Sequence, residues 1–132
     1  MYMKLLLFII AIFFSELASA EISYPYPTEP QVRMQRDETS QALKGQIQVI
    51  NPGKNIWLIQ AWGEDENRKK HPVIFPQISR IEKYGSVLLK IYPETVSENE
   101  MKWFVIKIIP TTQKEQYNRL SIPVVYRLKL IR

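Results

Sequence analysis

Histidine, serine and acidic residues are the side chains of this sequence that could carry acid–base or nucleophilic chemistry. The single histidine, His71, ends a charged stretch that begins at Glu64. A serine nucleophile needs an oriented base, and His71 is the one imidazole that could act as that base. The glycine patterns of nucleotide-binding loops and the G-x-S-x-G pattern of hydrolases do not occur. The sequence therefore predicts no catalytic residues and no enzymatic activity.

The same charged stretch lacks the residues of a metal site. The chain has no cysteine, and one histidine without a second histidine or a cysteine cannot complete a zinc site. The acidic run from Glu64 to Glu66 lacks the glycine and the distal glutamate of a calcium loop. We predict no metal and no cofactor, and we interpret residues 64–71 as a solvated loop between strands.

Positive charge is the clearest bias in the composition. Lysine and arginine number 18 against 13 acidic residues, and the formal net charge is +5. Such a charge favours an anionic partner or surface but does not determine the fold. The basic run Arg68-Lys69-Lys70 is too short for an arginine-rich arm, and no recognition helix or ribonucleoprotein signature occurs. We therefore predict no nucleic-acid partner.

The end of the chain combines this charge with regular alternation. In LSIPVVYRLKLIR, residues 120–132, an apolar side chain occupies every second position from Leu120 to Leu130, and three of the last six residues are basic. Alternation with period two places these apolar side chains on one face of a strand. That face either packs on the domain's own core or is offered to another chain. Pro123 removes one backbone donor, which favours an edge or an end position.

Turn-forming residues divide the rest of the chain into short β-rich runs, and no segment holds a helical period. The expected strands are residues 31–36, 45–50, 56–62, 73–75, 86–92, 101–109 and 120–131. About seven short strands at this spacing predict an all-β fold, an immunoglobulin-like β-sandwich. Its core is expected to include Trp57, Trp62, Val87, Leu89, Val105 and Ile106.

The beginning of the chain has the features of an export signal. Lys4 precedes ten apolar residues, 5–14, and Ala18-Ser19-Ala20 has the A-x-A spacing that signal peptidase accepts. Ten apolar residues are too few to cross a bilayer, which needs about 20. We predict a cleaved signal peptide at residues 1–20, a proline-rich lead at residues 21–30 and one domain at residues 31–132.

Four segments in order carry a resemblance to a known family. They are LIQAW at residues 58–62, HPVIFPQISRIEK at 71–83, WFVIKIIP at 103–110 and NRLSIPVVYRLKLIR at 118–132. Together they resemble the first domain of the periplasmic chaperones that assemble bacterial pili with an outer-membrane usher. The resemblance implies a periplasmic protein that stabilises pilus subunits by donor-strand complementation.

The resemblance also implies site residues. Chaperones of this family lend their last first-domain strand to a pilus subunit that lacks a strand of its own. The residues that match the apolar side chains entering the subunit groove are Leu120, Ile122 and Val124. Lys129 matches one of two cations that hold the subunit's terminal carboxylate. The second cation matches Arg33 in the first strand, with Arg36 as the alternative.

Some features depart from the family pattern. Gln77 follows Pro76, and Thr111 follows Pro110, where the family has paired prolines. The family's second immunoglobulin-like domain does not follow Arg132, which puts an usher partner in question. Another class of function is also open: an exported β-sandwich binding module whose basic end recognises an anionic glycan or another cell-surface ligand.

Overall fold

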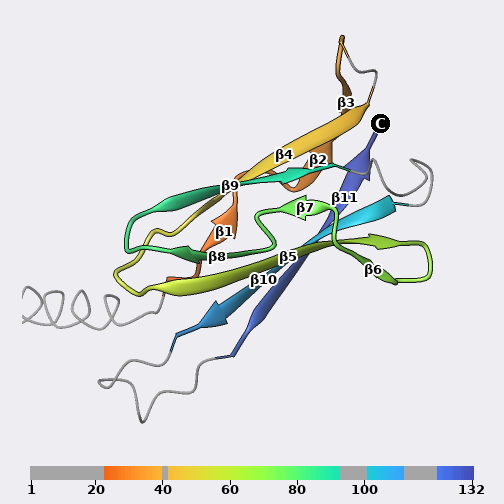
Figure 1. The fold of residues 1–132 in the computed structure, drawn as a ribbon. Helices are drawn as coiled ribbons and strands as arrows, with labels where there is room; N and C mark the ends of the chain where they lie inside the picture. Colours follow the sequence, from red (N-terminus) through yellow and green to blue (C-terminus); the bar gives the residue numbers. More distant parts are fainter. Residues whose placement is uncertain (1–22, 40–41, 93–100, 112–121) are drawn as a thin grey trace, which may run out of the picture.

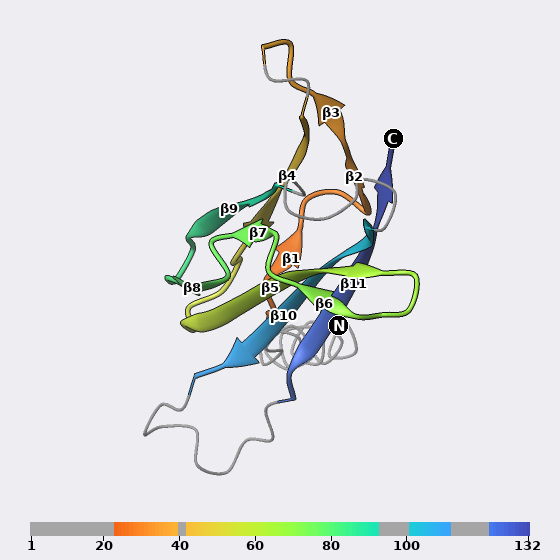
Figure 2. The same cartoon turned by 45° about the vertical axis from the view of Figure 1, so that its right-hand side comes forward.

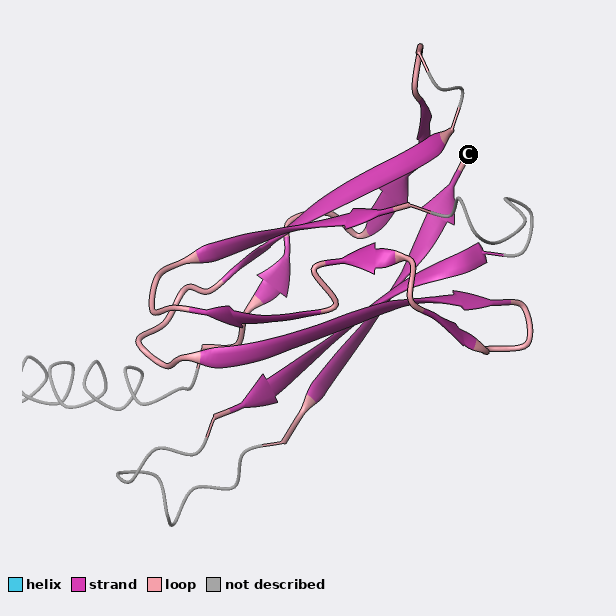
Figure 3. Cartoon of the chain, viewed as in Figure 1, coloured by secondary structure: helices cyan, strands magenta, loops and turns pink. Residues whose placement is uncertain are grey.

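β-Strands make up the regular structure of this chain. The computed structural model describes residues 23–39, 42–92, 101–111 and 122–132. Within them every helix or strand element is a strand (Figures 1 and 3), which confirms the all-β prediction. None of these ranges contains a helix with the length and apolar character needed to cross a membrane. The predicted signal peptide, residues 1–20, lies outside the described residues.

The first sheet has five strands, and all of its pairs are antiparallel. Its path across the sheet is β1 (Tyr26–Pro27), β4 (Leu43–Ile50), β9 (Ser86–Ile91) and β7 (Ile74–Phe75), and β3 (Gln35–Arg36) also pairs with β4. β4 and β9 form its centre, because they pair without interruption from Gly45 opposite Ile91 to Ile50 opposite Ser86.

The second sheet has six strands and contains the end of the chain. Its path is β2 (Gln31–Arg33), β11 (Val124–Ile131), β10 (Met101–Pro110), β5 (Trp57–Asp65) and β6 (Lys70–His71), and β8 (Ile78–Ile81) also pairs with β5. The β2–β11 pair is parallel, whereas the other pairs are antiparallel. The end of β5 and the whole of β6 fall within the stretch predicted as a loop, residues 64–71, so that prediction is wrong for Glu64, Asp65, Lys70 and His71.

The two sheets stack as separate layers (Figures 1 and 2) and enclose one apolar core. Phe104, Ile106 and Ile108 of β10 point into it and are fully buried. Alternate residues of each strand share a face, so the period-two pattern selects the inward side chains. Of the expected core residues, Trp57, Leu89 and Ile106 lie in this core and Val87 is half-buried against it. Val105 is buried on the outer face of the second sheet, so its predicted core position is wrong.

The first predicted strand, residues 31–36, is divided between the two sheets. β2 pairs with β11 in the second sheet, and β3 returns to pair with β4 in the first. Val32 of β2 and Met34, which separates the two strands, are buried and approach Gly45 so closely that a Cβ there would lie 2.9 Å from Met34 Sδ. The expectation of one continuous strand is therefore wrong. Alternation shows which face is buried, but it does not show which neighbour the backbone pairs with.

The proline-rich lead also belongs to the sandwich over its described part. Tyr26 and Pro27 pair with Ile50 and Val49 of β4. The ring of Tyr24 packs on Trp57 with 4.7 Å between ring centroids. These contacts hold residues 24–27, which precede β2, against β4 and β5.

Candidate functional site

β11 has one edge that is only partly paired. Along one side it pairs with β10, from Val124 opposite Ile108 to Lys129 opposite Trp103. Along the other side it pairs with β2, but only from Lys129 to Ile131. Within the described residues no strand pairs with residues 124–128 on this second side. Backbone donors and acceptors on such an edge can pair with an added strand.

The side chains on the apolar face of β11 become more exposed from Leu130 back towards Ile122. Leu130 and Leu128 are buried, and Tyr126 and Val124 are half-buried against the core. Ile122, just before the strand, is 59% exposed. Leu120 lies outside the described residues. One alternating pattern therefore serves the domain's own core at its end and presents an apolar side chain to the exterior at its beginning.

Arg33 and Lys129 lie on neighbouring strands and on the same face of the sheet. Lys129 is opposite Gln31, and Arg33 is opposite Ile131, so the two cations are diagonal neighbours. Diagonal neighbours in a sheet are about 7 to 8 Å apart at Cα. Both side chains are exposed, and neither has an ion-pair partner within the described residues. The fold thus brings together two basic residues that are 96 positions apart in the sequence.

Arg36, the alternative to Arg33, has a different position. It belongs to β3 and lies opposite Leu43 on the first sheet. β3 does not pair with β11. The pairing geometry thus favours Arg33 as the neighbour of Lys129, although the role of either arginine stays a prediction.

Glu64 forms a buried polar network that the sequence analysis missed. Its side chain is 4% exposed and accepts hydrogen bonds from Trp62 Nε1 at 2.9 Å and Arg127 Nε at 3.0 Å. Burial alone raises the pKa of Glu64, but these two hydrogen bonds and the charges of Arg127 and Arg68 outweigh it and hold the pKa below its usual value. Glu64 therefore stays ionised and neutralises Arg127.

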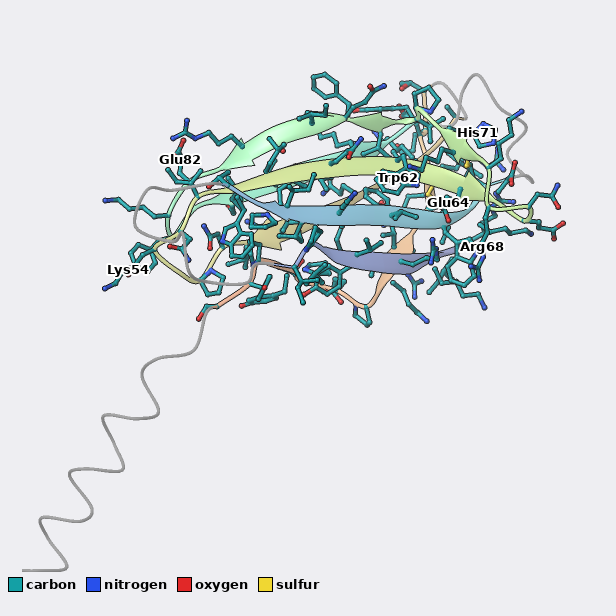
Figure 4. The ribbon with its side chains drawn as sticks, turned by 90° about the horizontal axis from the view of Figure 1, so that it is seen from below. Lys54, Trp62, Glu64, Arg68, His71 and Glu82 are labelled. Carbon is teal, nitrogen blue, oxygen red and sulfur yellow. The ribbon has the colours of Figure 1, made fainter. Side chains whose placement is uncertain are left out.

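This network explains why Trp62 is not in the core. Trp62 is half-buried on the outer face of the second sheet, opposite Val105, so its predicted interior position is wrong. Lys70 lies over the indole ring of Trp62, with its Nζ 4.2 Å from the ring centroid. Figure 4 shows Trp62, Glu64 and His71 toward one end of the sandwich, away from Lys54 and Glu82. A cation on an indole face is attracted by the ring's negative surface.

His71 has a structural contact. Its Nε2 lies 2.9 Å from Asp65 Oδ2 across the hairpin between β5 and β6. The same Asp65 accepts hydrogen bonds from the backbone N–H groups of Asn67 and Lys69. The pKa of Asp65 is lowered, first by the His71 hydrogen bond and then by the Lys69 N–H. Among the described residues no three His, Cys, Asp or Glu side chains gather as a metal ligand set.

The arrangement around β11 suits non-covalent binding of another polypeptide. Over the part of the chain that the structure describes, it combines a partly unpaired strand edge, an exposed apolar side chain at Ile122 and two cations without an ion-pair partner, Arg33 and Lys129. The edge supplies hydrogen bonds, the apolar side chain supplies burial, and the cations supply a site for an anion.

Sequence comparisons place this arrangement in a known context. A family model described as pili and flagellar-assembly chaperone, PapD N-terminal domain, matches residues 29–132. Protein FasE of Escherichia coli is 32% identical over 133 residues, which cover 98% of this chain and 100% of FasE.

Solved structures have the same fold. A chain in the complex of the SafA pilin with the SafB chaperone of Salmonella enterica aligns with a TM-score of 0.65 and 18% identity, over 85% of this chain and 55% of that chain. The Escherichia coli chaperone DraB aligns with a TM-score of 0.63 and 20% identity, over 83% and 55%. This chain thus spans about half the length of these solved chains. The likeness confirms the predicted immunoglobulin-like β-sandwich.

Proposed function

The chain belongs to the family of pilus and flagellar-assembly chaperones, and from this premise we propose that it binds pilus subunits in the periplasm and stabilises them by lending them β11. The observation that carries the proposal is the unpaired edge of β11 over residues 124–128, with the exposed Ile122 directly before it. An incomplete β-sandwich exposes apolar side chains and backbone groups along a groove. An added strand satisfies both.

Apolar burial supplies most of the proposed binding energy. Leu120, Ile122 and Val124 are the side chains proposed to enter the groove. Burying an exposed aliphatic side chain contributes about 1.5 to 3 kcal/mol in gross terms. Val124 contributes less than Ile122, because it is already half-buried against its own core. The exposed end of the apolar face is therefore the part that gains most from a partner.

The cations fix the position of the captured strand. We assign the subunit's terminal carboxylate to Arg33 and Lys129, which have no competing ion-pair partner within the described residues. A hydrogen bond to a charged group contributes about 1.5 to 3 kcal/mol. A slip of one residue between β11 and the subunit would turn the apolar side chains of β11 away from the subunit's groove. Anchoring the carboxyl end of the subunit's strand at the two cations prevents this slip.

Capture of a co-expressed subunit tests this proposal. A pilus subunit co-expressed in the periplasm is expected to co-purify with the chain but not with the Arg33→Ala/Lys129→Ala variant. The matched control is Arg80→Ala/Lys54→Ala, because Arg80 makes only an exposed ion pair with Glu82. Circular dichroism verifies that both variants fold. Undiminished capture by a folded Arg33→Ala/Lys129→Ala variant would refute the carboxylate anchor.

A further inference from the structure

A surface pocket of about 590 Å³ adjoins the proposed anchor. It lies where the chain leaves β1 on the first sheet, pairs with β11 through β2 and returns as β3. Its walls include Arg33 from β2, Lys44 from β4, Lys90 from β9 and Ile131 from β11. Strands of both sheets thus contribute to the pocket's lining, and Arg33 belongs to both the pocket and the anchor.

The lining carries an excess of positive charge. Lys90 lies opposite Gln46, so Lys44 is its diagonal neighbour on the outer face of the first sheet. Lys44 has one long contact, 3.6 Å to Asp37, between side chains that are both partly exposed. Lys90 has no ion-pair partner within the described residues. Against these cations and Arg33, the lining holds the carboxylate of Glu29.

The path of a captured strand leads to this pocket. A strand added along residues 124–128 with its carboxyl end at Lys129 runs parallel to β11. It must stop before Lys129, because Gln31 of β2 already lies opposite Lys129 on this edge of β11. Gln31 also lines the pocket. The last residues of the captured chain therefore end beside Gln31, a residue of the pocket's lining.

We propose that the pocket formed by Arg33, Lys44 and Lys90 receives an acidic side chain from the last two residues of the captured polypeptide. This inference rests on the proposed function and adds a preference to it. The terminal carboxylate binds at Arg33 and Lys129, while a second carboxylate binds at Lys90 and Lys44. The chain would thus favour subunits that end in acidic residues over subunits that end in neutral ones.

Two synthetic peptides test the preference. Both are short, alternate valine and threonine and have a free carboxyl terminus, but one ends in Glu-Glu and the other in Gln-Gln. Titration of each peptide into the isotope-labelled chain, followed by NMR, reports affinity and location together. The Glu-Glu peptide is expected to bind about threefold more tightly, as one exposed ion pair predicts. It should also shift the amide signals of Lys90 and Tyr92, which line the pocket.

Two variants sharpen the test. Lys90→Gln is expected to remove the threefold preference and leave the affinity for the Gln-Gln peptide unchanged. Lys54→Gln, in the loop between β4 and β5 and outside the pocket's lining, is expected to leave the preference intact. Equal affinities for the two peptides, with both shifting Lys129, would overturn the pocket and leave strand capture standing. If neither peptide shifts the signals of Lys129 and Arg33, both proposals fail.

Discussion

The two halves of β11 carry the same alternating apolar pattern in different surroundings. In the second half Leu128 and Leu130 are buried, the β10 pairing reaches Lys129, and β2 pairs with the strand from Lys129 to Ile131. In the first half Val124 and Tyr126 are half-buried, and one edge is unpaired within the described residues. The difference arises from the length of β2, which pairs with only three residues of β11.

The comparison shows how one strand can be both stable and available. The second half is held by the domain's own core, so β11 keeps its position before any partner arrives. The first half pairs with β10, and within the described residues no strand pairs with its other edge. An edge already held in place by β10 is a preformed template for an added strand, and a preformed template lowers the entropy that strand addition must overcome.

Truncation of one apolar side chain in each half gives the largest expected contrast. Leu128→Ala removes a buried side chain and is expected to lower the free energy of unfolding by about 2 to 5 kcal/mol. Ile122→Ala removes an exposed side chain and is expected to change it by less than about 0.5 kcal/mol. Urea unfolding measures both values. Similar losses in the two variants would show that the halves do not differ as described.

Glu64 of β5 holds Arg127, which lies on the outer face of β11, through a hydrogen bond and an ion pair. Glu64→Gln leaves Arg127 without its carboxylate and is expected to cost about 1 to 3 kcal/mol at neutral pH. Glu66→Gln is the control, because the Glu66 side chain is 76% exposed. We expect a change within about 0.5 kcal/mol for it.

The pH dependence of Glu64→Gln gives a second measurement. The pKa of Glu64 is lowered in the folded state, so its stabilising contribution is present above the unfolded value of 4.5 and is lost as the pH falls through the folded pKa. The stability difference between the wild type and Glu64→Gln should therefore shrink in acid below that value. A difference that stays constant in acid would contradict an ionised Glu64.

Tyr126, at the boundary between the halves, gives the smallest expected effect. Tyr126→Phe removes a 3.3 Å hydrogen bond from the hydroxyl to the Pro25 carbonyl and is expected to cost at most about 1 kcal/mol. Burial raises the pKa of Tyr126, so the wild type should lose stability as the pH rises above 10.0, and the variant should lose less. Thermal unfolding at neutral and alkaline pH measures both effects. The control is Tyr84→Phe, which alters an exposed ring; an equal change in this variant would argue against a specific contact of Tyr126.

Much of the fold was predictable, because alternation and turn residues are local signals. The runs around residues 45–50, 86–92 and 101–109 are strands within one or two residues of their expected limits. The short strands β1, β6 and β8 were not predicted. They depend on pairing with β4 and β5 and have little apolar pattern of their own.

The candidate site also has one part that could be predicted and one part that could not. The alternating face of β11 followed from the sequence pattern, and the family resemblance pointed to Lys129 and Arg33. The sequence did not show that Glu64 pairs with Arg127, because these residues are 63 positions apart and only strand register brings them together. Without that register, Arg127 and Lys129 are equivalent basic residues two positions apart on one strand face.

The sequence by itself determined the class of fold and the face of β11 that is apolar, since both follow from neighbouring residues. The tertiary structure decided where that face leaves the core, which cation is neutralised and which remain free. These features depend on how far β2 and β5 extend beside their partners. Pairing between distant segments is settled by packing of the whole core, and no short stretch of sequence contains it.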